Sequence, residues 1–164
     1  MSMHPCFVKT KEYYPSFLSP PVTEVKKPVV LVTGVFDLFH KEHATFLMRA
    51  ATYGKTLLVG IETDERVKII KGEGRPVEPL SVRAQRIHDL PYVTAAFVLP
   101  DTMGDKRTQM QLLEYIKPNI LAVSSHTNHL EEKQKSMHTI GGELLIVHQH
   151  NPEVSTTKIL EFKG

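Results

Sequence analysis

Residues 29–61 read VVLVTGVFDLFHKEHATFLMRAATYGKTLLVGI, and this segment carries the pattern of one strand–helix–strand unit. The β-branched run Val29–Thr33 predicts a buried strand that ends at a glycine. Apolar residues at helical spacing then predict a helix over His43–Tyr53, with Gly54 as its stop. Thr56–Ile61 predicts a second buried strand. Short loops between these elements indicate a parallel βαβ unit.

The same alternation continues along the chain. Further strands are predicted at Val93–Val98, Ile120–Ser124 and Glu143–His148, and further helices at Asp64–Ile70, Ser81–Leu90, Gln109–Ile116, His129–His138 and Thr156–Phe162. The pattern predicts an α/β protein with one Rossmann-like domain, in which a five-stranded parallel sheet carries helices on both faces. Ligands of such sheets bind beyond the carboxyl ends of the strands, so the search for chemistry begins there.

The start of the chain lacks this alternation. Prolines interrupt any periodic pattern, so we expect an N-terminal extension over residues 1–27 and the domain over residues 28–164. The single cysteine, Cys6, can form no internal disulfide, which favours a cytoplasmic protein. No apolar run approaches the ~20 residues that cross a bilayer. A formal charge of +2 does not call for nucleic acid or an anionic membrane as a partner.

The segment between the first strand and the first helix reads GVFDLFHKEH. Gly34 permits a sharp turn or a close approach of the backbone to a ligand. His40 and His43 stand three residues apart at the start of the helix, where free N–H groups and the helix dipole attract phosphates. Two imidazoles there suit the binding of a triphosphate. The alternative is that His40 caps the turn and His43 packs in the core.

Three strings of this chain resemble one family. Gly34-Val35-Phe36-Asp37 followed by His40 and His43 resembles the G-T-F-D and H-x-G-H signature of the nucleotidyltransferase superfamily. Residues 71–80, KGEGRPVEPL, and Arg83 beyond them are similar to a stretch of the nucleotidyltransferase domain of ADP-heptose synthase. Residues 154–159, VSTTKI, are similar to I-S-T-T-K-I of the glycerol-3-phosphate cytidylyltransferases. The order and spacing of the strings agree with the predicted elements.

The resemblance implies roles for individual residues. Catalytic roles fall on His40, His43 and Lys71, of which the histidines also bind the triphosphate and Lys71 bridges the phosphates of donor and acceptor. Nucleotide-binding roles fall on Gly34, Val35, Phe36, His43, Ser124, Ser155, Thr156 and Thr157. Acceptor-binding roles fall on Asp37, Arg75 and Arg83. Ser and Thr are also favoured helix caps, which suits the last three nucleotide-binding residues independently.

The resemblance also implies the substrates. A nucleotidyl group passes from CTP or ATP to a phosphorylated sugar or polyol, with release of pyrophosphate. Mg²⁺ is expected to arrive with the triphosphate, held by phosphates and water, so we expect no dedicated protein metal site. Histidine pairs elsewhere raise the alternative of zinc, but no cysteine pair supports it. A homodimer is a further expectation.

Two departures from the family pattern leave the nucleotide open. Glu42 replaces the glycine of H-x-G-H, and residues 122–126, AVSSH, replace the V-K-G-G-D of ADP-heptose synthases. Our hypothesis is that Glu42 turns away from the phosphates and reshapes the nucleoside pocket. These departures motivate an alternative function, a nucleotide-binding sensor or partner module without turnover. A flavin-adenine dinucleotide synthetase-like adenylyltransferase is a further alternative.

Overall fold

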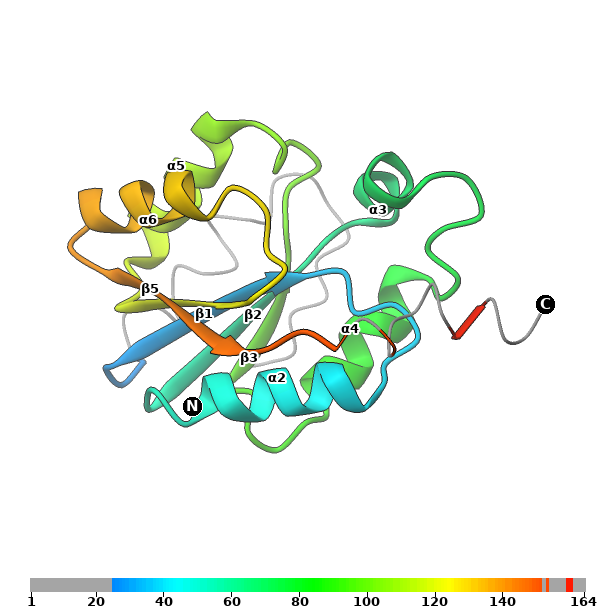
Figure 1. The fold of residues 1–164 in the computed structure, drawn as a ribbon, viewed down its shortest axis with the longest axis horizontal. Helices are drawn as coiled ribbons and strands as arrows, with labels where there is room; N and C mark the ends of the chain where they lie inside the picture. The colour runs from blue at the N-terminus through cyan, green and yellow to red at the C-terminus, as the bar shows by residue number, and fades with distance from the viewer. Residues whose placement is uncertain (1–24, 152, 154–158, 161–164) are drawn as a thin grey trace.

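The computed structural model describes residues 25–151, 153, 159 and 160 (Figure 1). Five parallel strands form one sheet in the order β3-β2-β1-β4-β5. The strands are β1 (Val29–Gly34), β2 (Thr56–Ile61), β3 (Ala95–Val98), β4 (Ile120–Ser124) and β5 (Glu143–His148). The predicted fold class is confirmed. Buried apolar runs make β1 to β4 parallel strands, because helices cover both of their faces.

Helices lie on both faces of the sheet, as Figure 1 shows. One face carries α2 (Lys41–Ala51) and α4 (Leu80–His88), which bury Leu47, Ala50, Ala84 and Ile87. The other face carries α5 (Lys106–Ile116) and α6 (Leu130–Thr139), which bury Leu112, Leu113, Ile116 and Met137. The short helix α3 (Asp64–Lys71) stands beyond the carboxyl ends of the strands. Within the described part of the chain, no helix is long and apolar enough to cross a membrane.

The predicted boundaries of the described elements differ from the structure by three residues at most, and those of β2, β4 and β5 agree with it. Helix α5 begins three residues earlier than predicted, because Asp105 caps it by accepting a hydrogen bond from the Arg107 N–H at 3.1 Å. Helix α2 begins at Lys41 with His40 as its N-cap. The predicted closing helix lies largely outside the described residues, of which Ile159 and Leu160 are helical. The N-terminal extension up to residue 24 lies outside them too.

The strand order reverses between β1 and β4, and this reversal creates the opening for a site. The chain runs outward from β1 to β2 and β3, then returns to place β4 on the other side of β1. Six residue pairs join β1 to β2, whereas only Val30–Ile120 and Leu31–Leu121 join β1 to β4. The carboxyl ends of β1 and β4 are therefore not paired with each other. A crevice at such a switch point is the usual ligand site of an open α/β sheet.

Arg83 holds together the loops that follow β1 and β2. It is 0% exposed and donates from Nη1 to the carbonyl oxygens of Val35 at 2.8 Å and Glu62 at 3.0 Å. Its Nε donates to the Glu78 carbonyl oxygen at 3.0 Å, and its Nη2 pairs with Asp64 at 2.6 Å. All these partners of the guanidinium are groups of the protein itself. This geometry does not support the prediction that Arg83 contacts an acceptor, because no face of its side chain is left for a ligand.

Replacing Arg83 with Met tests this structural role. The change leaves three partly buried carbonyl groups and the Asp64 carboxylate without their donor, so we expect the free energy of unfolding to fall by about 3 kcal/mol. Urea unfolding measures the difference. The control is Arg86→Met on the same helix, which breaks only the partly exposed pair with Glu78 and should cost less than about 1 kcal/mol. Equal losses of unfolding free energy in both variants would show that Arg83 stabilises the fold no more than a surface ion pair does.

Candidate active site

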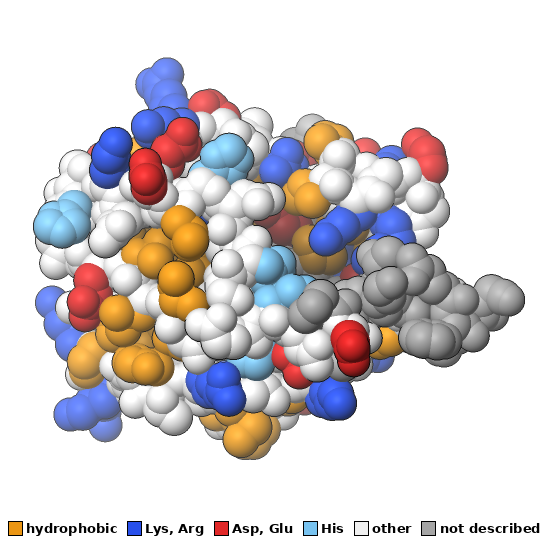
Figure 2. Space-filling view, in the orientation of Figure 1, with side chains coloured by type: hydrophobic (Ala, Val, Ile, Leu, Met, Phe, Trp, Pro, Cys, Tyr) orange, Lys and Arg blue, Asp and Glu red, His pale blue; other side chains and the backbone are white. Residues whose placement is uncertain are grey.

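One pocket, with a volume of about 360 Å³, opens at the carboxyl ends of β1, β4 and β5. Figure 2 shows histidine side chains gathered around a hollow on this face of the molecule. The sequence-predicted residues that line the pocket are Gly34, Val35, Phe36, Asp37, His40, His43, Lys71, Arg75 and Ser124. The structure therefore brings together residues from the β1–α2 loop, from α3 and the loop after it, and from β4.

The β1–α2 loop is shaped by a tight turn. A Cβ on Gly34 would lie 2.9 Å from Phe36 Cε2, so no side chain fits at this position while the ring stays in place. Phe36 and Leu38 adopt left-handed backbone angles, with φ of 55° and 47°. The turn buries the Phe36 ring, which meets His43 edge-on with 5.5 Å between ring centroids. Packing of Phe36 thus aims the start of α2 into the pocket.

His43 is held as a neutral hydrogen-bond donor. Its Nδ1 accepts the His40 backbone N–H at 3.3 Å, so the ring proton of the neutral form resides on Nε2. Burial, and then the charge of His40, lower the pKa of His43 to about 3. The ring is therefore neutral across the physiological pH range. It can donate to a phosphate oxygen without carrying a charge of its own.

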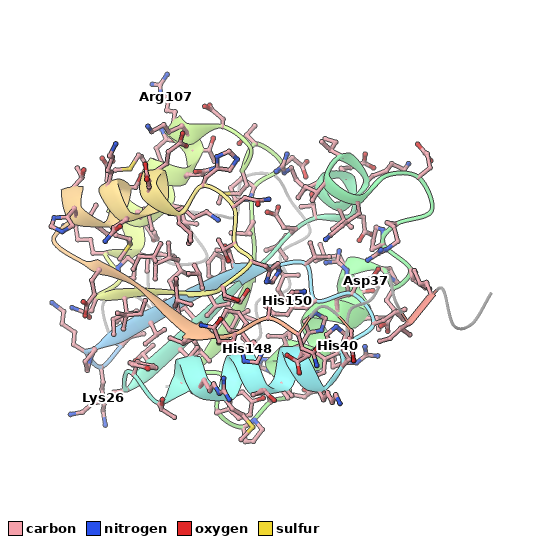
Figure 3. All side chains as sticks on the ribbon, in the orientation of Figure 1. Lys26, Asp37, His40, Arg107, His148 and His150 are labelled. Carbon is pink, nitrogen blue, oxygen red and sulfur yellow. The ribbon has the colours of Figure 1, made fainter. Side chains whose placement is uncertain are left out.

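His40 stacks on His43, with ring centroids 3.8 Å apart and an interplanar angle of 19°. Burial lowers its pKa as well, with Glu42 opposing the shift and His150 adding to it. Its buried Nδ1 has no hydrogen-bond partner among the described residues. A buried polar atom without a partner costs free energy, so this nitrogen is a natural contact for a ligand. In Figure 3, His40 lies near His150 at the start of α2.

Asp37 joins two loops of the site through its buried carboxylate. Its carboxylate is 1% exposed and accepts hydrogen bonds from the backbone N–H groups of Val77 at 2.8 Å and Glu78 at 3.0 Å. Arg75 Nε donates to the same group at 3.1 Å. Burial alone would raise the pKa of Asp37, but these three hydrogen bonds and the Arg75 charge lower it overall. Asp37 clamps the loop after α3 to the β1–α2 loop, and its predicted role in acceptor binding stays a prediction.

Lys71 reaches the pocket from α3. It is the last residue of that helix, and Gly72 and Gly74 follow with φ of 97° and 80°. A Cβ on either glycine would meet nothing within 4 Å, so only the backbone conformation requires glycine there. Arg75, which also lines the pocket, anchors the end of this loop through Asp37. Lys71 and Arg75 thus bring two cations to the pocket that the histidines also line.

The predicted nucleotide-binding residues of the C-terminal half are only partly described. Ser124 is buried at the end of β4, with its hydroxyl oxygen 2.5 Å from His126 Nδ1. Ser155, Thr156 and Thr157 lie outside the described residues.

The structure adds residues that the sequence analysis did not assign to a site. The pocket is also lined by Phe46, His126, His148, His150 and Lys133, and by Glu42, which the hypothesis of a reshaped nucleoside pocket had already named. The rings of His126 and His150 stack with centroids 4.0 Å apart. Each residue follows a strand, so the rule that ligands bind beyond the carboxyl ends of strands could have pointed to both. Lys133 lies inside α6, where the sequence carries no such signal. Among the described residues, no group of three His, Cys, Asp or Glu side chains could hold a metal ion.

Comparison with known proteins identifies the family. Residues 31–162 match the sequence model of the cytidylyltransferase-like family. The chain belongs to this family. The predicted superfamily and enzyme class, a nucleotidyltransferase, are thereby confirmed.

Curated relatives carry the name bifunctional protein HldE. The protein from Sodalis glossinidius (strain morsitans) is 32% identical over 134 residues, which is 80% of this chain and 26% of that protein. The protein from Campylobacter curvus (strain 525.92) is 34% identical over 96 residues, 58% of this chain and 19% of that protein. This chain thus spans about a fifth to a quarter of the length of these relatives.

Two solved structures share the fold. A lipopolysaccharide core biosynthesis protein from Thermoplasma volcanium superposes with a TM-score of 0.59 at 23% identity, over 75% of this chain and 95% of that one. A pantoate-beta-alanine ligase from Francisella tularensis superposes with a TM-score of 0.57 at 14% identity, over 96% of this chain and 76% of that one. At these identities the likeness concerns the fold.

The depressed pKa of His43 has a measurable consequence for stability. The unfolded chain binds the proton near pH 6.5 and the folded chain only near pH 3, so the free energy of unfolding falls as the pH drops through this window. Between pH 7 and pH 5, wild type should lose about 2 kcal/mol more than a His43→Asn variant, which has no ring to protonate. Urea unfolding at the two pH values measures both losses. Equal losses would mean that His43 titrates normally in the folded protein.

Proposed function

We propose that this protein transfers a nucleotidyl group from CTP or ATP to a phosphorylated sugar or polyol and releases pyrophosphate. The observation that carries the proposal is the stacked pair of His40 and His43 at the start of α2, which lines a pocket at the strand-order reversal. The family assignment and the HldE relatives support the reaction type. The choice between CTP and ATP and the identity of the acceptor are part of the proposal's test.

In the proposed reaction, a phosphate oxygen of the acceptor attacks the α-phosphorus of the triphosphate. A new P–O bond forms there, the bond from the α-phosphorus to the α–β bridging oxygen breaks, and pyrophosphate leaves with that electron pair. No covalent enzyme intermediate is needed, because such transfers depend on positioning and charge stabilisation. The Nε2–H of His43 and the ring of His40 would donate hydrogen bonds to phosphate oxygens that gain charge. The free N–H groups of the first turn of α2 would hold the same phosphates.

Lys133 would add a second source of positive charge beside Lys71. It lines the pocket from α6, the helix on the opposite face of the sheet from the histidines. Burial lowers its pKa, with Glu62 opposing the shift, and none of the described carboxylates forms an ion pair with it. A desolvated ammonium without an ion pair is a favourable place for an anion. We therefore place a phosphate group of one substrate within reach of Lys133.

Mg²⁺ would enter as part of the nucleoside triphosphate complex. The pocket fits this arrangement, because its acidic groups are already engaged within the protein. Asp37 accepts two backbone N–H groups and Arg75, and Glu42 contacts His148. The ion would be held by phosphate oxygens and water, and it would neutralise part of the phosphate charge. The predicted homodimer and the cytoplasmic location also stay predictions.

The direct experiment is a screen for pyrophosphate release. The purified protein is mixed with each Mg²⁺–nucleoside triphosphate and with each of a panel of sugar and polyol phosphates. We expect release only when both a nucleotide and an acceptor are present. Silence across the panel, together with tight nucleotide binding, would favour the sensor or partner module instead.

His43→Asn should lower kcat by about 10²- to 10³-fold, because a donor to the developing phosphate charge is lost. The control is His138→Asn, an exposed histidine on α6, which should leave kcat unchanged. Steady-state pyrophosphate release with the active substrate pair measures both. A His43→Asn variant with full kcat would remove the histidine pair from the proposed chemistry.

Lys133→Met should raise the KM of one phosphate-bearing substrate by about tenfold, the loss that removal of one charge-assisted hydrogen bond brings. Lys135→Met, an exposed lysine on the same helix, is the matched control. Separate KM values for nucleotide and acceptor show which substrate Lys133 contacts. If neither KM changes, Lys133 takes no part in substrate binding.

A further inference from the structure

Glu42 is a carboxylate in a pocket that we propose for a triphosphate. It lies in the first turn of α2, next to His43, and it lines the pocket. An acidic side chain there is favourable for the helix dipole. The same turn also offers the free N–H groups that would hold phosphates, so an unrestrained Glu42 carboxylate would lie close enough to repel them. The position of this charge therefore matters for binding.

The structure shows what restrains this charge. Glu42 Oε2 lies 2.7 Å from Nε2 of His148, the last residue of β5. On the other side of the same ring, His148 Nδ1 lies 3.1 Å from Nη1 of Arg49. A guanidinium has only donors, so Nδ1 must accept and the ring proton must reside on Nε2. The hydrogen bonds then run in one direction, from Arg49 to His148 and from His148 to Glu42.

Helix geometry explains why α2 supplies both the first donor and the last acceptor of these hydrogen bonds. Glu42, Phe46 and Arg49 follow one another at spacings of four and three residues, so they share one face of α2. His148 meets this face from β5, with its ring centroid 6.3 Å from that of Phe46. The His148 side chain is 8% exposed, so packing fixes the ring as well. Figure 3 shows His148 at the end of β5 beside α2.

We infer that Arg49 and His148 are positioning residues that hold the Glu42 carboxylate against β5, and that this restraint lets the pocket accept a triphosphate beside an acidic side chain. The inference rests on the proposed function only through triphosphate binding, not through turnover. It explains how the first turn of α2 can contain an acidic residue and still bind phosphates. In this inference, the fold holds the Glu42 carboxylate against β5 and away from the triphosphate.

The test is calorimetric titration with Mg²⁺–CTP and Mg²⁺–ATP of wild type and three variants. His148→Leu releases the Glu42 charge and should weaken binding of the preferred nucleotide by about tenfold. Glu42→Gln, which removes the charge, should bind within about threefold of wild type. The double variant Glu42→Gln with His148→Leu should recover to within about threefold of the Glu42→Gln variant, because no charge is left to release.

The recovery separates the inference from a merely structural role. If His148 served only the packing of β5, its replacement would weaken binding equally in both backgrounds, and that result would overturn the inference. Unchanged affinity in His148→Leu would also overturn it. Binding of neither nucleotide by wild type would overturn the proposed function together with the inference. Nucleotide binding with the expected recovery but without pyrophosphate release would count against turnover alone.

Arg49 provides a second route in case His148→Leu does not fold. Arg49 is exposed on α2, so Arg49→Leu should preserve the fold while it frees His148 Nδ1. The ¹⁵N spectrum of the imidazoles should show the Nε2–H form of His148 in wild type, and the Nδ1 signal should shift in Arg49→Leu because this nitrogen loses its hydrogen-bond donor. Nucleotide affinity should fall by about threefold in this variant and recover in combination with Glu42→Gln. An unaltered His148 spectrum would contradict the chain of hydrogen bonds.

Discussion

The site depends on how the chain turns at the end of β1. Phe36 packs against the bare face of Gly34, and this contact commits the next residues to a left-handed turn before α2 begins. The turn places His40 at the N-cap, and its backbone N–H then fixes the tautomer of His43. A side chain at Gly34 would displace the ring and, with it, the first turn of the helix. One close contact thus sets where the histidine pair stands.

The surrounding loops are held by buried charges that point inward. Arg83 joins the loops after β1 and β2, and Asp37 joins the β1–α2 loop to the segment after α3. The family resemblance implied a role in acceptor binding for both residues. Their use as internal ties leaves Lys71 and Lys133 as pocket cations whose ammonium groups have no ion pair among the described residues. A site for phosphates requires both loops that hold their positions and cations that are available to contact the anion.

The sequence was sufficient for the sheet and for one side of the pocket. Buried β-branched runs and helical spacing are local signals, so the strands, the helices and the position of His40 and His43 could be predicted. The partners of side chains could not, because they depend on contacts between distant segments. Arg83 and Arg75 look alike in the sequence, yet one is fully enclosed and the other lines the pocket. Lys133 lies 62 residues from Lys71 in the sequence, and only the fold brings both to one cavity.

Glu42 illustrates how one substitution is accommodated by residues far away in the chain. The sequence alone indicates a conflict between an acidic side chain and a phosphate seat, and it suggests that the carboxylate turns aside. The structure supplies the partner, because β5 ends beside α2 and brings His148 within 2.7 Å of Glu42. Arg49 completes the arrangement from two turns along the same helix. The acidic residue and its restraint therefore form one unit, and a chain that kept Glu42 without His148 would place an unpaired negative charge at the proposed phosphate site.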